Sequence, residues 1–152
     1  MFQDKTIIIT GGSSGIGAAT VALFSGAGAT VYILDKKKLA DVASQSIHYL
    51  ECDVSNADQV KSEMHTIFQK NPTIDYLFCN AGIHLFANIE ESSNEAMQKV
   101  FATNLLGTIY CLQQVLPIMK QQGFGSIVLM ASDQAFIAKE QCAIYGASKA
   151  AI

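Results

Sequence analysis

The sequence predicts an α/β fold built on a doubly wound parallel sheet with strand order 3-2-1-4-5. Short apolar runs alternate with stretches of helical periodicity along the chain, which is the pattern of β-α-β units. The first run, Thr6–Thr10, is apolar and β-branched, as expected of a strand buried on both faces. A glycine-rich turn follows it and leads into a helix. Right-handed crossovers restrict the topology further, and the order 3-2-1-4-5 is the one expected of such a doubly wound sheet.

Local signals place the first elements after that turn. A helix is expected over about 16–27, with apolar residues along one face and glycine at its end. The second strand, 30–34, stops at Asp35, and a short lysine-rich helix is expected over 36–44. The third strand is expected over 47–52.

The next β-α unit begins with a helix-start signal. Ser55 with Asp58 three residues later is typical of a capping box, and it predicts a helix from there to about Gln69. The following apolar run, 74–79, predicts the fourth strand.

The last third of the chain is mostly helical. The stretch 92–122 is expected to form two helical pieces that meet near Asn104, and Gly123 ends the second. A fifth strand is expected over 126–131, and a last helix begins near Ala143.

Length and composition exclude several classes of protein. No linker divides the 152 residues, so 1–152 is expected to be one domain. Half of the residues are hydrophobic and 15% are charged, which excludes an intrinsically disordered chain. The net charge is −3 and every basic residue is lysine, so nucleic acid is not an expected partner.

The sequence also argues against a membrane protein and against a metal site. No apolar run approaches about 18 residues, and the first residues do not resemble a signal peptide. We therefore expect a cytoplasmic protein. The four cysteines form no C-x-x-C pair, and the three histidines share no ligand spacing, so no metal is expected.

In a doubly wound sheet, ligands bind at the carboxyl ends of the strands. The turn after the first strand, Thr10-Gly11-Gly12-Ser13-Ser14-Gly15-Ile16-Gly17, lies between a strand and a helix N-terminus, where a pyrophosphate can bind. The alternative is a tight turn without a ligand.

Asp35, at the end of the second strand, is placed to accept hydrogen bonds from an adenosine ribose and to repel a 2′-phosphate. It could instead cap the helix that follows. Lys36, Lys37 and Lys38 could accept NADP, or they could form a solvated helix face. The absence of arginine and the position of Asp35 favour NAD over NADP.

Two further features can carry proton chemistry. Tyr145 and Lys149 are four residues apart in a helical stretch and therefore share one face. An ammonium beside a phenol favours phenolate, although such a pair can also be an ordinary surface contact. The Ser132 hydroxyl, after the fifth strand, could donate to a substrate carbonyl or merely cap a turn.

Taken together and in order, these motifs resemble the short-chain dehydrogenase/reductase family, which has a Rossmann-type fold. Thr10–Gly17 fits the family pattern T-G-x-x-x-G-x-G, and Tyr145-x-x-x-Lys149 fits its catalytic motif. Ser132 precedes the tyrosine at the family's spacing. The remaining matches are Asp53-Val54, Asn80-Ala81-Gly82 and Asn104.

The resemblance implies a role for each matched residue. Tyr145 is expected to be the general acid/base, Ser132 to polarise the substrate oxygen, Lys149 to bind the nicotinamide ribose, and Asn104 to hold a water linked to Lys149. The other residues expected to contact the cofactor are Gly11, Ser13, Ser14, Gly15, Ile16, Gly17, Asp35, Asp53, Val54, Asn80, Ala81 and Gly82. His84 is expected to be a solvated loop residue.

The leading hypothesis is an NAD(P)(H)-dependent oxidoreductase that acts on a secondary alcohol or ketone, with NAD the favoured cofactor. The alternatives are a non-catalytic dinucleotide-binding module or truncated paralogue with a regulatory or interaction role, and an interaction scaffold with a vestigial glycine loop. The apolar helix over about 105–122 predicts a homodimer or homotetramer. The family's substrate lid follows the tyrosine helix. Strand 126–131 is apolar like an interior strand, so we expect the polypeptide to continue beyond Ile152 and the fold to be incomplete here.

Overall fold

The computed structural model describes residues 2–37 and 44–152. Five parallel strands form one sheet in the order β3-β2-β1-β4-β5, as predicted. The strands are β1 (Thr6–Thr10), β2 (Thr30–Asp35), β3 (Ile47–Glu51), β4 (Tyr76–Cys79) and β5 (Ser126–Leu129). The strands β3 and β5 begin at the predicted residue and end earlier than predicted, while β4 begins later than predicted and ends at the predicted residue.

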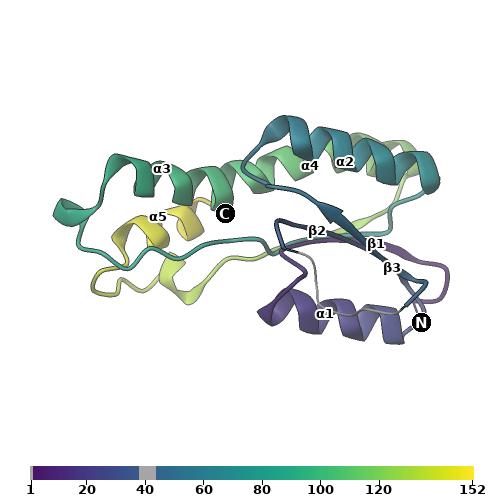
Figure 1. The fold of residues 1–152 in the computed structure, drawn as a ribbon, viewed down its shortest axis with the longest axis horizontal. Helices are drawn as coiled ribbons and strands as arrows, with labels where there is room; N and C mark the ends of the chain where they lie inside the picture. Colours follow the sequence, from purple (N-terminus) through teal and green to yellow (C-terminus); the bar gives the residue numbers. More distant parts are fainter. Residues whose placement is uncertain (1, 38–43) are drawn as a thin grey trace.

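Helices cover both faces of the sheet (Figure 1). On one face lies α1 (Gly15–Gly26), and on the other lie α2 (Ala57–Lys70) and α4 (Gly107–Gln122). The helices α3 (Asn94–Phe101) and α5 (Ala143–Ala151) lie together at the end of the molecule beyond the carboxyl ends of the strands. Two short 3-10 turns are η1 (Ile89–Glu91) and η3 (Asp133–Ala135).

Two apolar clusters, one on each face of the sheet, pack the helices against it. Alternate residues of β1 contribute to opposite clusters. Ile8 belongs to the larger cluster, which the sheet forms with α2 and α4. Ile7 and Ile9 belong to the smaller cluster, which includes Val21 of α1. All three isoleucines are fully buried, which explains the uninterrupted apolar run of this central strand.

The start of α2 differs from the predicted capping box. The N-cap is Asn56, whose side-chain oxygen accepts hydrogen bonds from the backbone N–H groups of Asp58 and Gln59. The predicted cap, Ser55, is engaged elsewhere, because both its backbone N–H and its hydroxyl donate to the Asp53 carboxylate. The prediction of Ser55 as the cap was therefore wrong by one residue.

The break predicted near Asn104 is a π-helical turn, η2 (Ala102–Leu106), which joins α3 to α4 without interrupting the helical path. Gly123 ends α4 in the left-handed conformation, with φ of +79°, as expected of a glycine cap. The lysine-rich helix predicted over 36–44 falls largely on residues 38–43, which lie outside the described residues.

The strand β5 forms one edge of the sheet, next to β4 only. Its residue Val128 is 55% exposed, so this apolar strand has an uncovered side within the described chain. A small apolar groove of about 180 Å³ lies beside it, lined by Phe24, Tyr76 and Val128 among others.

Candidate functional site

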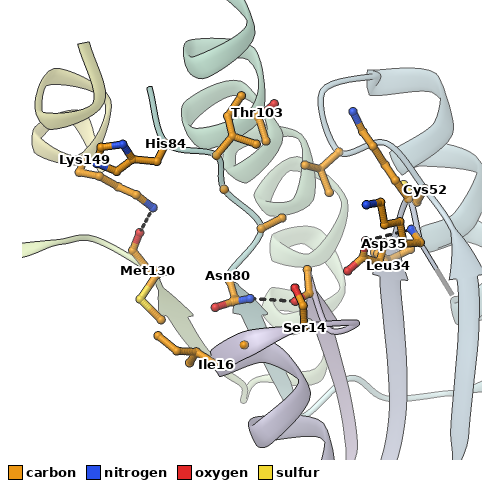
Figure 2. Close-up of a pocket in the computed structure, with 18 of the residues that line it drawn as sticks. Ser14, Ile16, Leu34, Asp35, Cys52, Asn80, His84, Thr103, Met130 and Lys149 are labelled. Carbon is orange, nitrogen blue, oxygen red and sulfur yellow. Dashed lines mark hydrogen bonds between the residues drawn. The ribbon is translucent and has the colours of Figure 1, made fainter. Parts of the chain in front are cut away.

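A cavity of about 580 Å³ opens at the carboxyl ends of the strands, where doubly wound folds bind ligands (Figure 2). It extends from the glycine-rich turn and the end of β2 to α5. Most of the predicted site residues line it: Gly11, Ser14, Gly15, Ile16, Asp35, Val54, Asn80, Ala81, Gly82, Tyr145 and Lys149. The other five do not line it: Ser13, Gly17, Asp53, Asn104 and Ser132.

Gly17 allows α1 to approach β1 closely. A Cβ at this position would overlap the carbonyl oxygen of Gly11 and lie 2.7 Å from the Asn80 amide nitrogen. At Gly15, in contrast, there is open space, because a Cβ there would meet nothing within 4 Å. The N-terminus of α1 therefore opens onto the cavity, where its backbone N–H groups can bind an anion.

Asp35 fixes the glycine-rich turn from the end of β2. One carboxylate oxygen accepts a hydrogen bond from the Ser13 N–H at 2.9 Å, and the other accepts from the Lys37 N–H at 3.1 Å. The hydroxyl oxygen of Ser13 is buried and has no hydrogen-bond partner among the described residues. A buried hydroxyl without a partner is costly, and this one lies next to Ser14, which lines the cavity.

Asp53 pairs with a lysine of the neighbouring strand end. Its carboxylate lies 2.6 Å from the Lys36 ammonium and also accepts both hydrogen bonds of Ser55. Partial burial alone would raise the pKa of Asp53, but the hydrogen bonds from Lys36 and Ser55 outweigh it and lower that pKa. Its neighbours Cys52 and Val54 line the cavity.

Asn80 ties β4 to β1. Its side-chain amide donates to the carbonyl oxygens of Thr10 and Gly11, and its backbone N–H donates to the Thr10 hydroxyl. The side chain thus holds the turn that follows β1 (Figure 2). Asn80 therefore has a structural role, because it satisfies backbone groups at the ends of two neighbouring strands.

Asn104 is 1% exposed and fastens the loop after β4. Its oxygen accepts from the Ile83 N–H at 2.8 Å, while its amide donates to the Ile83 carbonyl and to the Ser148 hydroxyl, both at 3.0 Å. A Cβ on Gly82 would lie 3.3 Å from the Asn104 oxygen and 3.4 Å from the Lys149 ammonium. The Asn104 oxygen, from the π-helical turn, and the Lys149 ammonium, from α5, therefore both lie close to Gly82, on the side that a Cβ would occupy.

Tyr145 and Lys149 lie on one face of α5, as their spacing predicts. The Lys149 ammonium is 5.8 Å from the centre of the Tyr145 ring and donates a 2.7 Å hydrogen bond to the Met130 carbonyl. Burial lowers the pKa of Lys149, since a charged ammonium is less stable away from water. The figure shows this lysine reaching from α5 toward the strand end that carries Met130 (Figure 2).

His84 contacts the predicted acid/base directly. Its ring centre lies 4.1 Å from that of Tyr145 and 4.8 Å from that of Phe86, on which it stacks. Its Nε2 atom lies 3.9 Å from the Cys142 sulfur. His84 lines the cavity although it is exposed, so the prediction of a solvated loop residue describes its exposure but not its contacts.

Ser132 caps the 3-10 turn η3. Its oxygen accepts from the Gln134 N–H at 3.2 Å and its hydroxyl donates to the Asp133 carboxylate at 3.0 Å. This is the turn-capping arrangement considered from the sequence. The turn packs against α5, so Ser132 is held near the tyrosine helix without lining the cavity.

Sequence reasoning missed some cavity residues. Met130 and Thr103 both line it, and Met130 accepts the Lys149 hydrogen bond through its backbone carbonyl. No side-chain signal could have found that acceptor, because every residue carries a carbonyl. Cys52 also lines the cavity, and burial raises its pKa to about 12, so it is a neutral thiol near pH 7.

Two searches of the described residues gave negative results. No cluster of three or more histidine, cysteine or acidic side chains there could hold a metal ion. Within the same part of the chain, no helix is both long enough and apolar enough to cross a membrane.

The chain is similar to several known proteins. The chain is 36% identical to an NAD-dependent glycerol dehydrogenase of Listeria innocua, covering 98% of this chain and 61% of that protein. The ligand-free aldohexose dehydrogenase of Thermoplasma acidophilum superposes with a TM-score of 0.93 at 34% identity, covering 99% of this chain and 58% of that one. The structure of ElxO with NADP bound superposes with a TM-score of 0.91 at 28% identity, covering 98% of this chain and 64% of that one.

The chain therefore spans about three fifths of the length of the proteins it matches. The sequence profile described as short chain dehydrogenase matches residues 5–152. The chain belongs to the short-chain dehydrogenase family.

Proposed function

We propose that this chain is the cofactor-binding part of an NAD(P)(H)-dependent oxidoreductase that transfers a hydride between nicotinamide and a secondary alcohol or ketone. One observation carries the proposal. A single cavity joins the open N-terminus of α1 at one end to Tyr145 and Lys149 at the other. A dinucleotide has an anionic pyrophosphate and a distant reactive ring, and this arrangement suits both.

The residues present fit such a cofactor. The position of Gly15 leaves space at the helix N-terminus, and the buried Ser13 hydroxyl lacks a partner within the described chain. Gly11, Ser14, Ile16 and Gly17 would form the phosphate turn, with Gly17 acting through close packing. We assign Asp35, Asp53 and Val54 to the adenine side and Lys149 to the nicotinamide ribose. Asn80, Ala81 and Gly82 would pass near the adenosine ribose.

The bound nicotinamide supplies or accepts the hydride, and the chain's own residues manage the proton. Tyr145 would donate a proton to the substrate oxygen in reduction and accept it in oxidation. The buried Lys149 ammonium, held by the Met130 carbonyl, would stabilise the phenolate form. Ser132 could polarise the same oxygen after its hydroxyl exchanges the Asp133 carboxylate for substrate.

Asn104 would act through the loop it fastens. Its two bonds to the Ile83 backbone hold the segment that carries His84 against Tyr145. The water that the family resemblance implies at Asn104 remains part of this proposal.

An alcohol or carbonyl substrate is supported by the relatives, which are a glycerol dehydrogenase and an aldohexose dehydrogenase. We favour NAD because Asp35 lines the cavity at the end of β2, and a carboxylate there would repel a 2′-phosphate. The similarity to the NADP complex of ElxO keeps NADP as the second possibility. A homodimer or homotetramer in the cytoplasm is also proposed.

Calorimetric titration with NADH and with NADPH tests the cofactor assignment. We expect one binding site per chain and a lower dissociation constant for NADH. Tighter binding of NADPH would contradict the role of Asp35. A chain that binds neither dinucleotide would refute the proposed function.

The second candidate is a dinucleotide-binding module without catalysis. It is favoured by one observation, that Ser132 does not line the cavity and its hydroxyl donates to the Asp133 carboxylate instead. Binding of NADH without turnover of any alcohol or carbonyl compound in a broad screen would support this module over the enzyme.

A further inference from the structure

The adenine side of the cavity contains an ion pair that the proposed function does not require. The Lys36 ammonium lies 2.6 Å from one oxygen of the Asp53 carboxylate. Lys36 lines the cavity directly after Asp35, the residue expected to contact the adenosine ribose. Whether Lys36 can meet a 2′-phosphate therefore depends on what holds its ammonium.

Asp53 is itself held rigidly. Its other oxygen accepts hydrogen bonds from the Ser55 N–H at 2.9 Å and from the Ser55 hydroxyl at 2.6 Å. The two bonds from Ser55 orient the Asp53 carboxylate, and Lys36 pairs with its other oxygen. The side chains of Lys36 and Asp53 are 51% and 30% exposed, so the ion pair has the modest strength of a partly exposed one.

Asp35 does not hold Lys36. Its two oxygens accept hydrogen bonds from the backbone N–H groups of Ser13 and Lys37. The ammonium is instead directed across to the end of β3, where Asp53 follows the strand.

We propose that Asp53 is a specificity-determining residue, which disfavours NADP by keeping the Lys36 ammonium in an ion pair and away from the ribose 2′-position. The inference rests on the proposed function, because it requires a dinucleotide in this cavity. It assigns the discrimination to two residues acting together: Asp35 repels a 2′-phosphate, and Asp53 removes the cation that would attract one.

The probes are NADH and NADPH, titrated into the wild-type chain and three variants, and the readout is the ratio of their two dissociation constants. In Asp53→Asn the amide no longer attracts the ammonium, and the ratio should move toward NADPH by about five-fold, which corresponds to an exposed charge pair of about 1 kcal/mol. Adding Lys36→Met to Asp53→Asn should return the ratio to the wild-type value.

The control is Glu51→Gln, which removes the same charge from an exposed side chain of β3 two residues earlier. It should leave the ratio unchanged. An equal shift in Glu51→Gln would mean that net charge alone governs NADPH binding, and it would overturn the proposal.

Two other outcomes would overturn it. If the gain of Asp53→Asn persists in the double variant, the carboxylate acts by its own charge and Lys36 has no role. If Asp53→Asn leaves the ratio unchanged while the wild-type chain binds NADH, the inference fails and the proposed function stands. Failure of the wild-type chain to bind either dinucleotide would instead refute both.

Discussion

Asn104 shows how much one buried side chain can organise. It was expected from the family resemblance to hold a water beside Lys149. In the structure its amide makes three direct hydrogen bonds, two to the backbone of Ile83 and one to Ser148. These bonds connect the loop after β4 to α5, so Asn104 contributes to the site by positioning the segments that carry His84 and Tyr145.

Lys149 gives a prediction about stability and pH. Burial lowers its pKa in the folded chain below the ordinary value of 10.5, whereas the unfolded chain keeps that value. Between the lowered pKa and 10.5 the unfolded state binds more protons, so the free energy of unfolding rises with pH across this window. Lys149→Met lacks the titrating group and should not show this rise.

The measurement is the free energy of unfolding of both chains by urea denaturation, from neutral to alkaline pH. The wild-type chain should gain stability relative to Lys149→Met as the pH increases through the window. A constant difference between the two chains would show that the ammonium is as well solvated in the folded state as in the unfolded one.

At the level of elements, the contact between α1 and β1 depends on Gly17. A Cβ there would overlap the Gly11 carbonyl oxygen, so Gly17→Ala must push the start of α1 away from the strand. We expect a loss of about 2 kcal/mol in the free energy of unfolding, as for other overpacked sites. Binding of NADH should weaken as well, because the helix N-terminus moves.

Gly26→Ala is the matched control for this variant. It lies at the other end of α1, where a Cβ would meet nothing within 4 Å. The substitution should stabilise the chain by up to about 1 kcal/mol, because alanine has less conformational freedom to lose. Similar unfolding curves for the two alanine variants would contradict the close approach at Gly17.

The sequence was sufficient for the sheet because its information is local and repeated. The β-branched run of β1 and the glycine-rich turn predicted the first β-α unit. The alternation of strands and helices predicted a doubly wound sheet, and the strand order expected of that fold is confirmed. The cap of α2 could not be settled in this way. Ser55 and Asn56 are both good caps, and the choice between them depends on the bonds that Ser55 makes to Asp53.

In the candidate site too, the sequence predicted the residues that belong to local motifs but not the contacts between distant segments. Motif residues such as Gly15 and Tyr145 line the cavity, because each motif is tied to a strand end or a helix face. The contact of His84 with Tyr145 and the pairing of Lys36 with Asp53 join segments that are far less constrained by the sequence pattern. Such contacts depend on side-chain directions that only the folded structure supplies.

At the scale of the whole molecule, an exposed apolar stripe suggests self-association. Leu106, Ile109 and Leu116 are each 38% to 39% exposed, and their spacing places them along one side of η2 and α4. We expect the chain to form a homo-oligomer through this stripe. Sedimentation at micromolar concentration should show a dimer or larger species, and Leu116→Lys should dissociate it.

Leu23→Lys is the control for that experiment. Leu23 is 73% exposed on α1, on the opposite face of the sheet, and its replacement should leave the association unchanged. A wild-type chain that remains monomeric would rule out the predicted interface.

Hydride transfer by the wild-type chain and by Tyr145→Phe tests the central claim most directly. The variant keeps an aromatic ring against His84 and loses only the oxygen that moves the proton. In a screen of secondary alcohols and ketones with NAD(H), we predict turnover by the wild-type chain, at least a hundred-fold loss (on the order of a general acid/base contribution) in the variant, and similar NADH affinity in both. Comparable turnover by Tyr145→Phe, or NADH binding without any turnover by the wild-type chain, would contradict the account.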